Sequence, residues 1–294
     1  MKLLQGPAVP DGRFCQLRQE HYNAEIRDLF QYGPALSPMH WAFPSNMKAT
    51  AIATMTAARG DQDAAVLIAS IGVLSHMGLP IFAADAGSIA AFTDRARELS
   101  QLDLWREGTT LVQQIKACFR RVLKTGHRVI LYTEPDKKEF FKSGVVRFLE
   151  TIGRREAVAV CVASRDQESF ATFPPGQQTA EGAFNTLASN ALGLTLDLLY
   201  GPLILDLELI ATYLDQVPDD LGWGWRTYVI ARSILAGKKV ASFVGPFCCP
   251  LEQRTEKSRD RIYRLVQLEQ NVKGLRLAIE HSQSAFESIL VSNR

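Results

Sequence analysis

The chain has 294 residues, with 33 Lys and Arg against 31 Asp and Glu, so its formal net charge is only +2. This balance gives no electrostatic case for binding nucleic acid or an acidic membrane surface. Hydrophobic residues make up 47% and charged residues 22%, which excludes a disordered or fibrous protein. The length is sufficient to bury a large core.

Three parts are expected along the chain: an N-terminal extension (1–45), an α/β domain (46–250) and a helical C-terminal segment (251–294) that packs on that domain. The apolar run after Met1 is too short for a signal peptide and is interrupted by prolines. Free thiols in a reducing cytoplasm are expected, because the cysteines are few, scattered and without a CxxC pair. They are Cys15, Cys118, Cys161, Cys248 and Cys249.

The main domain opens on two apolar segments. The spacing in 47–60 predicts a helix that ends at Gly60, and the run 64–74 reads as a buried strand. Residues 64–84 carry no Asp, Glu, Lys or Arg and are long enough to span a bilayer. Because Gly78 and Pro80 punctuate this run, we expect a path within a globular domain and no transmembrane segment.

Further along, predicted strands alternate with predicted helices at least four times. Strands are expected at 80–88, 127–135, 156–165 and 240–247, and helices at 89–102, 108–126, 138–155, 180–200, 205–218, within 219–239 after an opening loop, and over most of 251–294. This order predicts an α/β fold with a mainly parallel sheet flanked by helices and a helical C-terminal tail. In such sheets, ligands bind outside the carboxyl ends of the strands.

The first polar group at a predicted strand end is Asp85, followed by Gly87 and Ser88. Small residues here let a nucleotide base or ribose approach the backbone, and the carboxylate can accept a hydrogen bond from either. The alternative is a turn in which Asp85 caps the next helix. The residues alone leave both interpretations open.

Glu134 and Asp136 lie at the end of the strand predicted at 127–135, separated by Pro135. Two carboxylates at this spacing can face one divalent cation, and hard oxygen ligands suit Mg²⁺ or Mn²⁺ bridging to a diphosphate. The alternative is a solvated turn before the next helix, which the spacing alone favours.

Two glycines alternate with two large aromatic residues in the stretch Gly222-Trp223-Gly224-Trp225, which Arg226 follows. Aromatic faces commonly pack on sugar rings, and the acids just upstream, Asp219 and Asp220, can hold hydroxyl groups. A helix N-terminus stabilised by aromatic packing explains the same residues equally well.

Four arginines lie close together near the start of the tail: Arg254, Arg259, Arg261 and Arg264. Arginine clusters bind phosphate groups. Acidic residues are interspersed among them, however, so a solvated helix with internal ion pairs is favoured.

Taken in order, the strand ending FAADAGS, the strand ending YTEPD and the GWGW loop before a helix resemble the GT-A fold glycosyltransferases. The match is best to family 2 and to enzymes of the glucosyl-3-phosphoglycerate synthase type, over roughly 46–271. The resemblance implies that Asp85, Gly87 and Ser88 contact the nucleotide and that Glu134 and Asp136 hold Mg²⁺ or Mn²⁺. It places the sugar and acceptor pocket at Gly222, Trp223, Gly224, Trp225, Arg226, Gln178 and Thr179.

The function implied is transfer of a sugar from a nucleotide-diphosphate donor to a small-molecule acceptor, with Asp220 orienting or deprotonating the acceptor hydroxyl. The chain departs from the family pattern at Glu134, where Asp is usual, and at Arg226, where an acid is expected. The missing acid at Arg226, together with the absence near Cys248 of the histidine that can ligate the metal in the family, motivates the alternative of a catalytically silent GT-A-like binding or regulatory module. A hydrolase with Asp85 as nucleophile is disfavoured, because Gly87 stands where its second acid belongs. A cytoplasmic location and a homodimer are further expectations.

Overall fold

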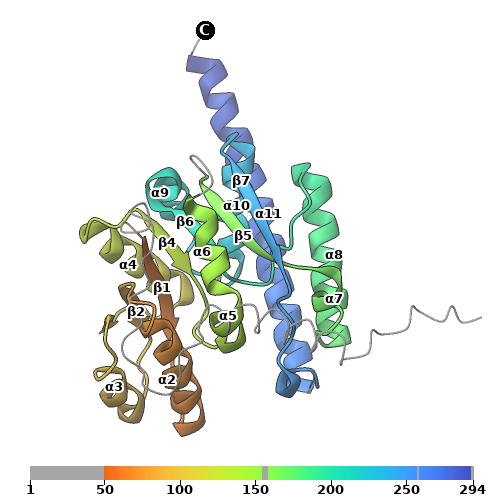
Figure 1. Ribbon diagram of the computed structural model, residues 1–294. Helices are drawn as coiled ribbons and strands as arrows, with labels where there is room; N and C mark the ends of the chain where they lie inside the picture. Colours follow the sequence, from red (N-terminus) through yellow and green to blue (C-terminus); the bar gives the residue numbers. More distant parts are fainter. Residues whose placement is uncertain (1–49, 154–157, 257, 293–294) are drawn as a thin grey trace, which may run out of the picture.

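The computed structural model describes residues 50–153, 158–256 and 258–292. One seven-stranded sheet runs through the molecule, in the order β3-β2-β1-β4-β6-β5-β7, with helices on both faces (Figure 1). The expected N-terminal extension lies outside the described residues.

The strands are β1 (Thr50–Thr56), β2 (Ile81–Asp85), β3 (Leu102–Arg106), β4 (Val129–Tyr132), β5 (Val160–Arg165), β6 (Leu203–Asp206) and β7 (Val240–Gly245). The helices are α2 (Asp61–Ser75), α3 (Ala90–Ala96), α4 (Leu111–Lys124), α5 (Lys138–Ser143), α6 (Val145–Gly153), α7 (Gln167–Phe170), α8 (Pro175–Leu192), α9 (Leu207–Asp215), α10 (Gly224–Leu235) and α11 (Ser258–Ser292), with a 3-10 turn at Leu251–Gln253.

The sheet is mainly parallel, as the alternation of strands and helices predicted. β1 pairs in parallel with β2 and β4, β2 with β3, and β5 with β7. Only β6, inserted between β4 and β5, runs antiparallel to its neighbours. The carboxyl ends of the six parallel strands therefore share one edge of the sheet, and β6 begins at that same edge.

Two apolar layers cover the sheet, one on each face. Side chains from α4, α8, α9, α10 and α11 form the core on one face, and side chains from α2, α3, α5 and α6 form the core on the other. Alternate residues of β1 point into the two cores: Ala51 and Ala53 into the first, and Ile52 into the second. The helix α11 packs against α10 and α8 and extends beyond the sheet (Figure 1).

The two opening elements are the reverse of the sequence prediction. The segment expected to be a helix contains β1, in which all seven residues are buried, and the segment expected to be a strand is the helix α2. The buried residues of α2 recur at helical spacing, at Ala64, Leu67, Ile68 and Ile71. Exposed positions such as Val66 are also apolar, so this periodicity is hidden in the sequence.

Other differences concern boundaries and two short strands. β3 and β6 were not predicted: β3 falls almost entirely in the short gap between the helices expected at 89–102 and 108–126, and β6 overlaps the start of the helix expected at 205–218. The helix expected over 138–155 is divided at Gly144 into α5 and α6. The helix expected over 180–200 begins at Pro175 and ends before Gly193, whose left-handed φ of 67° terminates it. Among the described helices, none combines the length and apolar character needed to cross a bilayer.

The contact between α10 and α11 depends on glycine. The carbonyl group of Gly224 lies directly against Gly274, leaving no room there for a β-carbon. The same crossing is fixed by a hydrogen bond from Thr227 Oγ1 to Asn271 Oδ1 at 2.7 Å.

We predict that Gly274→Ala destabilises the protein by about 1–3 kcal/mol, because the added methyl group overpacks this crossing. The matched control is Gly182→Ala in α8, where a β-carbon meets nothing closer than 4.0 Å. That substitution should be neutral or stabilise the helix by about 0.5–1 kcal/mol. Urea denaturation of both variants measures the difference, and equal stability of the two variants would contradict the account of the crossing.

Candidate functional site

Residues far apart in the sequence meet at the edge of the sheet where the parallel strands end. Glu134 lies two residues after β4, Arg165 ends β5, and Tyr200 comes shortly before the antiparallel β6. The first turn of α10 and the start of α11 close over this edge. A cavity of about 160 Å³ lies between them. Its walls are formed by Glu134, Asp136, Lys137, Arg165, Phe173, Gln177, Leu199, Tyr200, Trp223, Arg226, Cys249, Gln253, Tyr263, Arg264 and Gln267.

A buried ion pair joins two walls of this cavity. The Arg226 guanidinium donates from Nη1 to Glu134 Oε1, and both side chains are almost completely buried. The second carboxylate oxygen, Oε2 of Glu134, and Nε of Arg226 have no hydrogen-bond partner. Gly201 lies against the Glu134 carboxylate, and a side chain there would overlap it. The pair thus leaves one buried acceptor and one buried donor without a protein partner.

Asp136 lines the same cavity and is exposed to solvent. The structure therefore brings together the two acids that were predicted to hold a metal. Their oxygens suit a hard divalent cation, and the unused Oε2 of Glu134 is a suitable ligand. Among the described residues, no group of three or more His, Cys, Asp or Glu side chains is placed to hold a metal ion. A cation here would need further ligands from a bound phosphate group and water, as Mg²⁺ commonly does.

The residues from Gly222 to Arg226 have two different environments in the structure. Trp223 and Arg226 line the cavity, as predicted for the pocket. Trp225 does not: its ring is fully buried in the core, edge-on to Tyr132 with the ring centroids 4.8 Å apart. Gly222 and Gly224 pack against Gln270 of α11. The prediction that Trp225, Gly222 and Gly224 form the pocket is corrected, because all three serve the packing of α10.

Asp85 lies at the same edge of the sheet but does not line the cavity. Its Oδ1 accepts hydrogen bonds from Thr56 Oγ1 at 2.7 Å and from Ser88 Oγ, and its Oδ2 accepts from the backbone N–H groups of Gly87 and Ser88 at 2.9 and 2.8 Å. Gly87 has a φ of 98°, which a side chain would strain. These are the contacts of a carboxylate that fixes the β2–α3 loop. Contact between Asp85, Gly87 or Ser88 and a nucleotide stays a prediction.

Three other predicted residues lie away from the cavity. The Asp220 side chain is 73% exposed and accepts a hydrogen bond from Lys273 Nζ at 2.8 Å, which lowers the pKa of Asp220 and weakens it as a base. Gln178 donates to the carbonyl oxygen of Ala171 at 3.0 Å. Thr179 donates to the carbonyl oxygen one turn earlier in α8. The predicted roles of Asp220, Gln178 and Thr179 at the site are therefore not supported by their positions.

The residue of α8 that does reach the cavity is Gln177, one position before the predicted pair. Gln177 and Glu181 lie one turn apart on the buried face of the helix, and Gln177 Nε2 donates to Glu181 Oε1 at 2.7 Å. Residues four positions apart share one face of a helix, so Gln177 faces inward with Glu181, whereas Gln178 and Thr179 lie on other faces. The sequence prediction missed Gln177 because it began the helix at residue 180.

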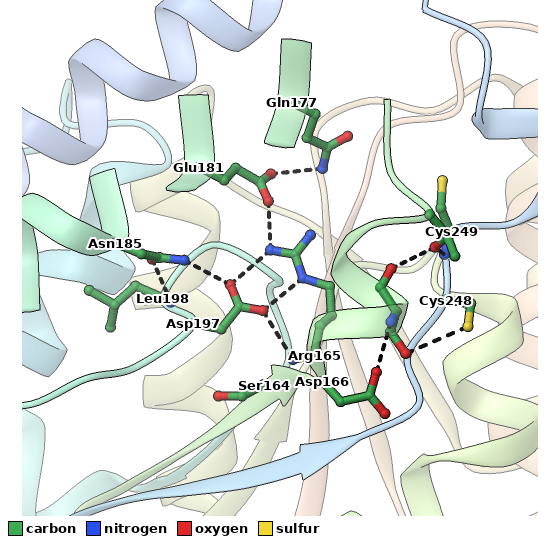
Figure 2. Close-up of polar contacts among 12 residues, drawn as sticks. Ser164, Arg165, Asp166, Gln177, Glu181, Asn185, Asp197, Leu198, Cys248 and Cys249 are labelled. Atoms are coloured by element: carbon green, nitrogen blue, oxygen red, sulfur yellow. Dashed lines mark hydrogen bonds and ion pairs between the residues drawn. The ribbon is translucent and has the colours of Figure 1, made fainter. Parts of the chain in front are cut away.

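Arg165 is the most constrained cation of the site (Figure 2). Its Nε and Nη2 donate to the two carboxylate oxygens of Asp197 at 2.7 and 2.8 Å, and Nη2 also donates to Glu181 Oε2 at 2.6 Å. Asp197 further accepts hydrogen bonds from the backbone N–H of Arg165 and from Asn185 Nδ2. The remaining nitrogen, Nη1, has no partner. The Arg165 side chain is 0% exposed.

The pKa values follow from this network. Burial lowers the pKa of Arg165, but the hydrogen bonds and charges of Asp197 and Glu181 outweigh burial and raise it above its ordinary value. Burial raises the pKa of Asp197, but the hydrogen bonds and charge of Arg165 outweigh it and lower that pKa below its ordinary value. Both groups are therefore charged at neutral pH.

Aromatic rings support the cations of the cavity. The Arg165 guanidinium carbon lies 4.4 Å from the Phe173 ring centroid and 5.4 Å from that of Tyr200. Lys137 Nζ lies 5.2 Å from the same Tyr200 centroid. Tyr200 in turn stacks on Phe247, with the two ring planes 3° apart. A rigid aromatic base thus holds two cations on one side of the cavity.

Comparison with known proteins places this fold. The chain matches no family model, and it matches no curated protein by sequence. Among solved structures, it is similar to glucosyl-3-phosphoglycerate synthase from Mycobacterium tuberculosis in complex with Mn²⁺, UDP-glucose and phosphoglyceric acid, at 12% identity and a TM-score of 0.56 over 81% of this chain and 86% of that one. Its complex with Mn²⁺, UDP and phosphoglyceric acid gives 12% identity and 0.55 over 81% and 84%. The expected GT-A fold is confirmed.

We predict that Asp197→Asn destabilises the protein at pH 7 by about 3–5 kcal/mol, because Arg165 loses the charge that compensates it in a buried site. The folded-state pKa of Asp197 lies below its ordinary value of 3.8, so its contribution is complete above that value and is lost as the pH falls toward the folded-state pKa. Urea denaturation at several pH values measures this, and a stability difference that stays constant down to pH 3 would contradict it.

Proposed function

We propose that this chain is a glycosyltransferase that binds a nucleotide-diphosphate sugar together with Mg²⁺ or Mn²⁺ and transfers the sugar to a small-molecule acceptor. The observation that carries the proposal is the position of Glu134 and Asp136, which follow β4 and face one cavity with Trp223 and Arg226. The similar solved structures support it, since they are of a named synthase in complexes with Mn²⁺ and UDP-glucose or with Mg²⁺ and UDP.

In this proposal Asp136 and the free Oε2 of Glu134 hold the cation. The cation, when bound, supplies positive charge that stabilises the leaving nucleotide diphosphate. Arg226 compensates the buried charge of Glu134 and keeps its carboxylate oriented, and its unused Nε–H can donate to a phosphate oxygen. Trp223 offers an aromatic ring beside these groups, suited to packing against a sugar.

A second candidate is a GT-A-like module that binds the nucleotide sugar without turnover. One observation favours it: among the described residues that line the cavity, Glu134 and Asp136 are the only carboxylates. If both hold a cation, no further acid lines the cavity to accept a proton from an acceptor. Asp220, predicted for that task, is on the surface and paired with Lys273.

We predict that UDP or GDP, or one of their sugar conjugates, raises the melting temperature only when Mn²⁺ is present, because ligands of the folded state stabilise it by mass action. Asp136→Asn removes one cation ligand and should abolish the shift. The matched control is Asp94→Asn, the same change on α3, where the Asp94 side chain is 65% exposed and pairs with Arg97 outside the cavity.

A turnover assay then distinguishes the two candidate functions. It measures the release of free nucleotide from the bound nucleotide sugar in the presence of a panel of acceptors. Turnover that requires Asp136 supports the transferase. A metal-dependent shift without turnover supports the silent module. Both candidate functions would be contradicted if no nucleotide or nucleotide sugar raises the melting temperature, or if Asp136→Asn leaves that increase unchanged. The expected homodimer stays a prediction, for which sedimentation equilibrium is the test.

A further inference from the structure

An open groove lies beside the cavity, between the first turns of α8 and α11. Its volume is about 510 Å³, which is within the roughly 300–1,000 Å³ of typical small-molecule sites. Pro175, Gly176 and Ala180 line the groove from α8, and Leu265 lines it from α11. These four residues present apolar surface, so the groove suits an apolar chain or ring.

Two of the charged residues in the groove wall satisfy each other. Arg261 Nε donates to Glu256 Oε2 at 3.1 Å, and the Glu256 side chain is only 10% exposed. The Glu256 carboxylate lies against Gly176, where a β-carbon would come within 2.7 Å of it, so it also occupies the positive end of the α8 dipole. This contact fixes the segment before α11 against α8 and leaves the groove no carboxylate that needs a cationic ligand.

Arg264 connects the groove with the cavity. Its side chain lines the groove, the cavity and a narrow space of about 30 Å³ that shares walls with both. Ala180 borders the groove and the narrow space, whereas Leu199 and Gln267 border the narrow space and the cavity. The narrow space has room for about two water molecules. The three spaces therefore form one path along α8 and α11, narrowest beside Arg264.

The size of these spaces indicates what the groove holds. The cavity of about 160 Å³ is smaller than a typical small-molecule site, so a donor and an acceptor that meet there need adjoining space. Seven residues line the groove, whereas a stable protein–protein interface uses about 20–30 residues on each side. A single small molecule therefore fits the groove better than a second copy of the chain does.

We propose that the groove binds the apolar part of an amphipathic acceptor, whose hydroxyl end reaches the cavity past Arg264. This inference rests on the proposed function and names the substrate class. In the transfer, the acceptor oxygen forms a bond to the anomeric carbon of the donor sugar as the bond from that carbon to the diphosphate breaks. The released diphosphate keeps the bonding electron pair, and the hydroxyl proton passes to it.

The test uses methyl, hexyl and octyl β-glucoside as probes, below the concentrations at which they form micelles. Isothermal titration calorimetry of the full chain measures their affinities. Octyl glucoside should bind about fourfold more tightly than hexyl glucoside, which is about twofold for each CH₂ group that the open groove partly covers. Methyl glucoside should bind more weakly than both. An affinity that does not depend on chain length would overturn the proposal.

Leu265→Gln removes apolar surface from the groove wall and should weaken octyl glucoside binding by about fivefold. The matched control is Ile262→Gln, about one turn earlier on α11. Leu265 is 64% exposed and Ile262 66%, so both variants should fold, but only Leu265 lines the groove. Equal weakening by the two variants would show that the probe binds the open face of α11 and would overturn the proposal.

Sedimentation equilibrium of the same samples tests the other occupant, a second copy of the chain. A dimer that dissociates in Leu265→Gln would place the second copy in the groove and would overturn the proposal. A monomer, or a dimer that this substitution leaves intact, supports a groove that is open to an acceptor.

Release of UDP from UDP-glucose with Mn²⁺ tests the link to the donor. At equal, subsaturating concentrations, octyl glucoside should give faster release than methyl glucoside, in proportion to its tighter binding. Ala180→Leu narrows the path and should reduce this advantage. The matched control is Ala183→Leu on the same helix, which is exposed and outside the groove.

Equal rates of release with the two probes, including no release with either, would overturn the assignment of the groove to the acceptor. If UDP-glucose does not bind at all, the proposed function fails. The affinities of the three glucosides, and the comparison of Leu265→Gln with Ile262→Gln, still decide in that case whether the groove holds an apolar chain.

Discussion

The buried ion pair between Glu134 and Arg226 is the contact on which the site depends. It ties the loop after β4 to the first turn of α10, two segments 92 positions apart. Removing either partner would leave a buried charge without compensation, which is among the most destabilising changes a protein can undergo. Because the pair uses one oxygen of Glu134 and one end of Arg226, it fixes both groups and still leaves one acceptor and one donor without a protein partner.

The rest of the cavity is organised by the sheet and by the long C-terminal helix. The antiparallel β6 lies between β4 and β5, so it separates the acids after β4 from Arg165. Helix α11 contributes Tyr263, Arg264 and Gln267 to the wall, and its position is set by the close contact between Gly224 and Gly274. Side chains on a tail that reads as a solvated helix thus become part of the site through the packing of two glycines.

Strand ends were the most informative signal in the sequence. The strand predicted at 127–135 placed Glu134 and Asp136 at a strand end, and in the structure both follow β4 and line the cavity, because parallel strands bring their carboxyl ends to one edge. That they hold a metal stays a prediction. The strand predicted at 156–165 also ends at Arg165, but nothing in the sequence identifies Asp197 and Glu181 as the partners of this arginine. Trp225 was assigned to the pocket because a large aromatic residue suits both a core and a sugar, and composition does not distinguish the two.

The incorrect predictions also have physical causes, because each depends on packing that the sequence does not show. The predicted types of the first two elements are interchanged: a helix is expected where β1 lies, and a strand where α2 lies. The reason is that fully buried strands and helices with apolar outer faces both lack a clear hydrophobic periodicity. Gln177 and not Gln178 reaches the cavity because Gln177 shares the buried face of α8 with Glu181, and the predicted helix, which began at residue 180, did not include either glutamine. Asp220 was chosen for its acidity and its neighbours, but only the position of Lys273 on α11 shows that it faces solvent in an ion pair.

The most direct test of the central claim is a crystal structure of the chain with UDP and Mn²⁺, with the metal located by its anomalous signal. We predict a manganese peak beside Asp136 and the unpaired oxygen of Glu134, with the UDP diphosphate next to it in the cavity and Arg226 still contacting Glu134. A nucleotide bound outside this cavity, or manganese held by other residues, would contradict it.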